Sequence, residues 1–180
     1  MLARIEAARM GHRRAAFLAL LVVGGVTNAA AARSPANVPP DVERAFELAY
    51  PDLALNESFS EAVSRMAPDQ LVGLDNAVKG KLFEIELVDH LNDGALPEGW
   101  HAELAEAANQ PGWDLRIIDN QGQVAELVQA KATDSVAYVK EALAQYPDID
   151  VTTTTEVHGQ LLAMGMADRV HDGGVTEAAL

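Results

Sequence analysis

Apolar residues recur at helical spacing in four stretches of the chain. Short amphipathic patterns over Asp41–Tyr50 and Ser58–Met66 are each followed within two residues by a proline, which does not continue a helix. The longest helical pattern covers Asp69–Asn92. A fourth helix is predicted over Ser135–Tyr146, with Asp134 or Ser135 as its N-cap. Its apolar stripe consists of Val136, Val139, Leu143 and Tyr146.

Between these helical patterns the texture changes to short apolar runs separated by glycine and asparagine. Trp113–Asp119 and Val124–Ala132 flank Asn120-Gln121-Gly122, which has the composition and length of a β-hairpin turn. Asp119 is interpreted as a turn former. The β-branched run Ile149–Thr153 predicts a further strand.

A last helix is expected to run to Gly165, with Thr153 and Glu156 as its capping box. The order helix, strand, strand, strand, helix, strand, helix predicts an α/β fold in which helices flank a small mixed sheet. A further helix is predicted to start beyond Asp172-Gly173-Gly174, which leaves open that the sequence is a fragment truncated at its C-terminal end.

The first residues have a different pattern. Four arginines precede an apolar run over Ala15–Val26, and small residues follow over Ala29–Ala32, as in a secretory signal peptide. The alternatives are a retained membrane anchor facing outward, which contacts the membrane through residues 15–32, or a misassigned start. We therefore expect a signal or anchor at residues 1–32, a linker with short helices at 33–68 and an α/β domain at 69–180. We expect the protein to be exported, to the periplasm or the outside of the cell, or to be anchored to the membrane facing outward.

Composition narrows the classes of function. Apolar residues make up 49% and charged residues 22% of the 180, as in ordinary globular proteins. The absence of cysteine excludes disulfides, thiolate metal sites and cysteine nucleophiles. No histidine spacing suggests zinc. The net charge of −14 opposes non-specific binding of nucleic acid, so any such role requires a local basic or metal-filled cleft.

Three polar residues occupy positions where burial is expected. Asp114 begins a strand directly after Pro111-Gly112, and Lys131 lies on the neighbouring strand beside two alanines. A lysine in such a strand needs an anionic partner, and Asp114 is the nearest candidate. Glu84 lies on the apolar side of its predicted helix, between Gly80, Leu87, Val88 and Leu91. Taken singly, each of these residues is most simply explained by an ordinary solvated or ion-paired side chain.

Together with their order along the chain, these residues resemble the PD-(D/E)xK nuclease superfamily, which has the restriction-endonuclease-like fold. The resemblance covers roughly Asp75 to Val157. The matching segments are Lys79-Gly-Lys-Leu-Phe-Glu84, Gly112-Trp-Asp114 and Leu127-Val-Gln-Ala-Lys131. Gln129 stands where the superfamily has an acidic residue, as in Mrr-type restriction enzymes with a Gln-x-Lys form, and this removes one anionic ligand.

The resemblance implies a hydrolase that cleaves the phosphodiester bonds of nucleic acid. Asp114 and Glu84 would bind Mg²⁺ or Mn²⁺, with Gln129 Oε1 and the Ala130 carbonyl as neutral ligands. Lys131 would orient the attacking water and balance negative charge. The alternative is a catalytically silent module of the same fold that binds a protein or cell-envelope partner. In either case, Glu126 is expected on the opposite face of its strand.

Overall fold

The computed structural model describes residues 38–107, 110–166 and 168–180. The predicted signal or anchor segment at residues 1–32 lies outside these residues. Among the helices that are described, none is long and apolar enough to cross a membrane. The described chain divides into two compact units: residues up to Leu82 together with Ala178–Leu180, and Phe83–Glu177. The division falls within one long helix.

The first unit is helical. It contains α3 (Pro40–Ala49), α4 (Pro51–Ala54), α5 (Phe59–Arg65) and the first part of α6 (Pro68–His90). The rings of Phe46 and Phe59 pack edge to face with centroids 5.8 Å apart, and both are fully buried. A capping box at Ser58 begins α5, since the Glu61 carboxylate accepts from the Ser58 N–H at 2.8 Å.

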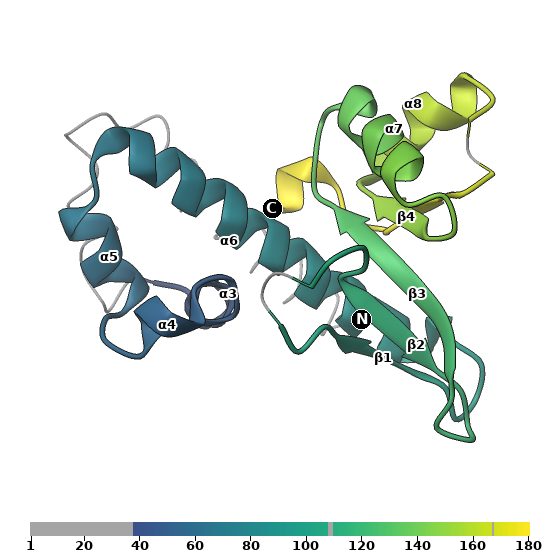
Figure 1. The fold of residues 1–180 in the computed structure, drawn as a ribbon, viewed down its shortest axis with the longest axis horizontal. Helices are drawn as coiled ribbons and strands as arrows, with labels where there is room; N and C mark the ends of the chain where they lie inside the picture. Colours follow the sequence, from purple (N-terminus) through teal and green to yellow (C-terminus); the bar gives the residue numbers. More distant parts are fainter. Residues whose placement is uncertain (1–37, 108–109, 167) are drawn as a thin grey trace. The chain divides into compact units, whose positions relative to one another are not determined.

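The second unit is built on a five-stranded mixed sheet in the order β1-β2-β3-β4-β5 (Figure 1). Its strands are β1 (His101–Leu104), β2 (Leu115–Ile118), β3 (Val124–Lys131), β4 (Asp150–Thr153) and β5 (Val170–Asp172). The pairs β1–β2 and β2–β3 are antiparallel, whereas β3–β4 and β4–β5 are parallel. The parallel pairs require crossover connections, which α7 (Val136–Gln145) and α8 (Thr155–Ala163) supply.

The crossover helices α7 and α8 lie beside β4 (Figure 1), and α8 also packs against β5. One apolar cluster joins these elements. The cluster consists of Val139, Ala142, Val151, Val157, Leu161 and Val170. The second part of α6 packs near β5, where Gly173 leaves room for Phe83. A Cβ at Gly173 would lie 2.9 Å from the Phe83 ring. The side chains of the apolar cluster are all aliphatic, in agreement with the small number of aromatic residues in the chain.

The edge of β1 is covered by a side chain. A π-helical turn over Leu91–Ala95 follows α6, and Asn92 extends from it toward the strand. The Asn92 amide donates to the Ala102 carbonyl at 3.0 Å and accepts from the Ala102 N–H at 2.7 Å. The side chain thus satisfies the backbone groups of Ala102 that point away from β2.

The mixed α/β architecture and the hairpin are confirmed. Asp119 closes the hairpin turn, since its Oδ1 accepts from the N–H groups of Gln121 and Gln123, each at 2.8 Å. Ser135 caps α7, because its hydroxyl accepts from the Tyr138 N–H at 3.3 Å.

The predicted capping box of Thr153 and Glu156 is wrong. Thr153 is still part of β4, and its hydroxyl donates to the Lys131 carbonyl at 2.8 Å. The N-cap of α8 is Thr154, and the Glu156 carboxylate accepts from the Glu177 N–H at 3.1 Å. Adjacent threonines suit both a strand and a cap, so the sequence pattern placed this boundary one residue too early.

Candidate functional site

Asp114 occupies a fixed position directly before β2. Its N–H donates to the Val128 carbonyl of β3 at 2.9 Å, which extends the β2–β3 ladder by one residue. Gly112, two residues earlier, has a φ of 89°, a conformation that favours glycine. The chain therefore turns sharply at Gly112 and presents the Asp114 carboxylate against the C-terminal half of β3.

Asp114 and Lys131 form the predicted ion pair. The Lys131 Nζ lies 3.5 Å from Asp114 Oδ2, and the same oxygen accepts from the Ala130 N–H at 2.8 Å. The two side chains are only 17% and 21% exposed, so the pair is screened less than a surface pair. The expectation that Lys131 takes Asp114 as its anionic neighbour is confirmed.

Gln129 lies two residues before Lys131 and is 6% exposed. No hydrogen-bond partner for its side-chain Oε1 is found within the described part of the chain, although this atom is fully buried. A buried amide oxygen without a partner costs about 1–3 kcal/mol. The Gln129 Oε1 is therefore an acceptor whose desolvation no described group offsets.

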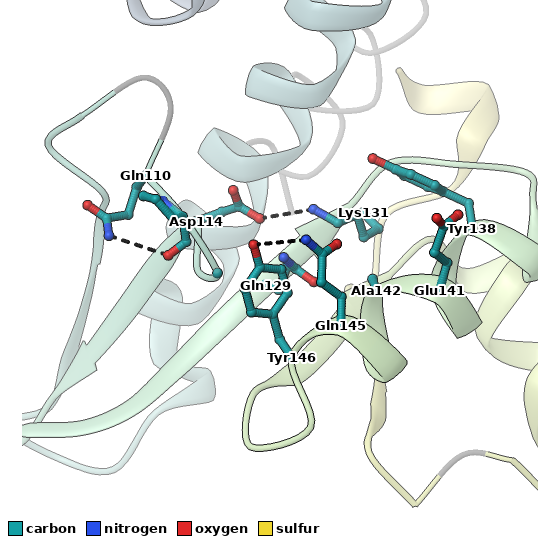
Figure 2. Close-up of a pocket in the computed structure, with 11 residues that line it drawn as sticks. Gln110, Asp114, Gln129, Lys131, Tyr138, Glu141, Ala142, Gln145 and Tyr146 are labelled. Carbon is teal, nitrogen blue, oxygen red and sulfur yellow. Dashed lines mark hydrogen bonds and ion pairs between the residues drawn. The ribbon is translucent and has the colours of Figure 1, made fainter.

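Asp114, Gln129 and Lys131 line one cavity of 280 Å³ within the second unit (Figure 2). The loop before β2, the end of β3 and one face of α7 form its walls. Two of the predicted ligands are not among its lining residues. Glu84 lies on α6 and is 7% exposed, and Ala130 is 8% exposed within β3. The structure thus gathers three of the candidate residues around a common space.

Sequence reasoning missed the α7 side of this cavity. Four of the residues there carry polar groups, namely Tyr138, Glu141, Gln145 and Tyr146. The helical pattern assigned Tyr146 to the apolar stripe, because its ring has the right spacing. The position of α7 in the sequence could have indicated this wall. The helix follows soon after Lys131, so its side chains lie near the end of β3.

The ring of Tyr146 packs close to the turn at Gly112. A Cβ at Gly112 would lie 3.2 Å from Tyr146 Cε1 and 3.3 Å from Ile149 Cδ1, closer than most such contacts. The Gln145 Nε2 lies 3.4 Å from the Tyr146 hydroxyl. Glycine at position 112 therefore both permits the turn that presents Asp114 and gives space to the ring across the cavity.

Glu126 takes part in a second polar cluster. Possible ligand atoms of Glu126, Asp150 and His171 lie within 4.8 Å of one another. In the β3 register Glu126 alternates with Gln129 and Lys131, so it belongs to the opposite face of the strand. Asp150 already pairs with Arg169 at 3.2 Å and with His171 at 3.1 Å. The arrangement is compatible with a metal ion but does not specify Mg²⁺.

Comparison of this chain with protein-family models, with curated proteins and with solved structures finds no match in any of the three. The chemistry of the cavity must therefore be argued from its own residues. Among the described residues these combine two carboxylates, those of Asp114 and Glu141, and an amide oxygen without a hydrogen-bond partner there, which are oxygen ligands of the kind that hard cations prefer, with one ammonium group.

Proposed function

We propose that this protein hydrolyses phosphodiester bonds of nucleic acid with the help of a divalent metal ion held beside Asp114. The observation that carries the proposal is Gln129, a residue that lines the same cavity as Asp114 and Lys131 and whose buried Oε1 finds no hydrogen-bond partner among the described residues. A structural glutamine would be expected to satisfy this atom. A glutamine that holds a ligand would leave it unpaired in the unliganded protein.

Asp114 and Gln129 are the residues that would hold the ion. Both offer oxygen atoms, which suits Mg²⁺ or Mn²⁺. When bound, the ion supplies positive charge that polarises a phosphate oxygen and lowers the pKa of water. Glu84 and the Ala130 carbonyl remain further candidate ligands on the strength of the sequence resemblance.

Lys131 would position the attacking water and offset the negative charge that develops on phosphorus. Its ammonium group is 3.5 Å from Asp114, at the long end of hydrogen-bond distances, so its hydrogens are not committed to a tight ion pair. The burial of this ammonium group strengthens its field inside the cavity relative to water. In a chain with a net charge of −14, this local cation has a disproportionate effect on an anionic substrate.

The order of α6, β1, β2, β3, α7 and β4 supports a finer assignment of the second unit to the restriction-endonuclease-like fold. It also supports membership of the PD-(D/E)xK superfamily in its Gln-x-Lys form. Both assignments are part of this proposal and rest on element order and on Asp114, Gln129 and Lys131.

The decisive experiment is a cleavage assay of the full chain on labelled DNA and RNA, with Mg²⁺ or Mn²⁺ titrated from zero. Asp114→Ala and Lys131→Ala are expected to abolish cleavage, while Glu126→Ala, on the opposite face of β3, retains it. Gln129→Glu should lower the metal concentration at half-maximal rate, because it adds a charged ligand. Absence of cleavage in both metals, with Gln129→Glu also inactive, would overturn the proposal.

We also propose that the chain is exported or anchored facing outward through Ala15–Val26. Leu20→Asp places a carboxylate in the middle of this apolar run, which costs about 2.5–3.5 kcal/mol of insertion free energy. The variant should therefore remain in the cytoplasm when cell fractions are compared by immunoblotting. An unchanged distribution between fractions would contradict this location.

A second candidate is a catalytically silent module of the same architecture that binds a protein or cell-envelope partner. The observation that favours it is the engagement of Asp114 Oδ2 by both the Ala130 N–H and Lys131. These contacts satisfy that oxygen without a metal. Cleavage by the wild type distinguishes the two candidates, and Asp114→Asn completes the test: it removes cleavage from a nuclease, whereas in a silent module stability is the property that it changes.

A further inference from the structure

The α7 wall of the cavity carries neutral hydrogen-bonding groups and one carboxylate, that of Glu141. Gln145 and Tyr146 come from the C-terminal end of α7, and Gln110 lies across from them, beside Asp114 on the loop before β2 (Figure 2). Lys131 is the one basic residue among the described residues that line the cavity. Apart from the position beside Lys131, the wall is therefore poorly suited to a second phosphate group, which arginine and lysine usually bind.

The neutral groups have hydrogen-bonding capacity to spare. The Gln145 Nε2 is 3.4 Å from the Tyr146 hydroxyl, and the Gln110 Nε2 is 3.4 Å from the Pro111 carbonyl, both at the weak end of the range. Each amide offers two donors and one acceptor, and the tyrosine hydroxyl can serve as either. A nucleobase edge presents donors and acceptors together, whereas a phosphate presents only acceptors. The amide wall thus matches a base better than it matches a phosphate.

The size of the cavity limits what it can hold. Its 280 Å³ is just below the ~300–1,000 Å³ that is typical of small-molecule pockets, so it suits one nucleotide. Tyr138 lies beside it and is 50% exposed, which leaves its ring available for stacking. In a duplex the base edges are paired and stacked, so a base reaches such a wall only after it has been extruded. An unpaired base presents its edge and face without that cost.

We propose that Gln145 and Tyr146, with Gln110 across the cavity from them, form a pocket for a single unpaired nucleobase, so that the preferred substrate is single-stranded nucleic acid or an unpaired strand end. This inference rests on the proposed function, because it places the base next to the groups that would act on the adjoining phosphate. Gln129 and Asp114, the residues that would hold the metal ion, line the same cavity. The base is recognised by neutral groups, which the net negative charge of the chain does not oppose.

The test separates binding from cleavage. Binding of adenosine, cytidine, guanosine and uridine 5′-monophosphates to the full chain is measured without metal by NMR titration, with ribose 5-phosphate as the probe that lacks a base. At least one nucleotide should bind more tightly than ribose 5-phosphate. Gln145→Ala and Tyr146→Phe should each weaken that binding about fivefold, the effect of one lost neutral hydrogen bond. Gln121→Ala, at the exposed hairpin turn, is the matched control and should leave binding unchanged.

Cleavage rates on a single strand and on the matching duplex complete the test. Faster cleavage of the single strand, with the preference reduced by Gln145→Ala, supports the base pocket. Equal binding of ribose 5-phosphate and all four nucleotides would overturn it, as would equal rates on both substrates. Nucleotide binding that depends on Gln145 without any cleavage would overturn the proposed function and leave the pocket standing.

Discussion

Gln129 has a buried side-chain oxygen whose desolvation no hydrogen bond from the described residues compensates. The burial of this oxygen lowers the stability of the unliganded protein, while the same oxygen is available to bind a ligand. The side chain is 6% exposed and lies in the central part of the sheet, where an apolar side chain would pack without such a cost. The retention of an amide there is understandable if the oxygen is needed by a ligand.

Gln129→Met should therefore stabilise the unliganded protein. Methionine has a similar length and no unsatisfied oxygen, so we expect the free energy of unfolding to rise by about 1–2 kcal/mol. Urea unfolding at neutral pH in the presence of a chelator measures this change. Gln145→Met, at an exposed position, is the control and should give no comparable gain. A less stable Gln129→Met variant would show that the oxygen is satisfied in the native protein.

The contribution of the buried Asp75 to stability depends on pH. It is 3% exposed on α6, and burial raises the pKa of its carboxyl, while Lys79 at 3.2 Å lowers it by a smaller amount. Between the unfolded and the raised native pKa, the native state binds more protons than the unfolded state. The contribution of Asp75 to stability is therefore lost as pH rises through this interval.

Asp75→Asn removes that pH dependence. Relative to the wild type, the variant should become progressively more stable as pH rises from about 4, the usual range of a free aspartate, and then level off. Unfolding free energies from urea titrations across this range give the curve. Asp69→Asn changes an exposed carboxylate on the same helix and serves as control. A curve of the same sign and size in both variants would contradict the role of burial.

The backbone conformation of the loop before β2 shapes one wall of the cavity. Gly112 and Gly122 both have positive φ, of 89° and 77°, but only Gly112 has side chains close to the position of a Cβ. Gly112→Ala should therefore cost more stability than Gly122→Ala, which pays only the conformational penalty of about 1–3 kcal/mol. Chemical denaturation of both variants measures the difference. Equal losses would mean that Tyr146 and Ile149 move aside freely.

Much of the second unit could be predicted because local patterns there agree with the tertiary structure. The β2–β3 hairpin, α7 and the proximity of Asp114 to Lys131 all follow from alternation, turn residues and the cost of burying a lysine. The three-residue strand β5 was missed, since Val170–Asp172 is too short to show a period. Tyr146 was interpreted as a core residue because spacing cannot tell a ring in the core from one that lines a cavity.

Charge is the property that belongs to the whole molecule. With 27 acidic and 13 basic residues, the chain repels an anionic substrate at a distance, and within the described cavity lining Lys131 and a bound metal ion would oppose this locally. If the proposed function holds, association with nucleic acid is limited by long-range repulsion. Salt screens this long-range repulsion more than it screens contacts inside the cavity, because the Debye length falls from about 30 Å at 0.01 M to about 10 Å at 0.1 M.

The cleavage rate at limiting substrate and saturating Mg²⁺ should therefore rise when KCl is increased from 0.01 to 0.1 M, by about 10-fold or less given the size of steering effects. Most nucleic-acid-binding proteins behave in the opposite way. An uncharged osmolyte at matched osmolality is the control. A rate that falls steadily with salt would show that a basic surface, and not the net charge, governs association.

An open sheet has two outer strands, and each can recruit a strand from another copy of the chain. On the β1 side, Asn92 already makes the two hydrogen bonds to Ala102 that an incoming strand would need. On the other side, β5 offers only three residues. A neighbouring molecule therefore meets a blocked or very short edge on either side, which protects an aliphatic sheet from joining others into fibrils.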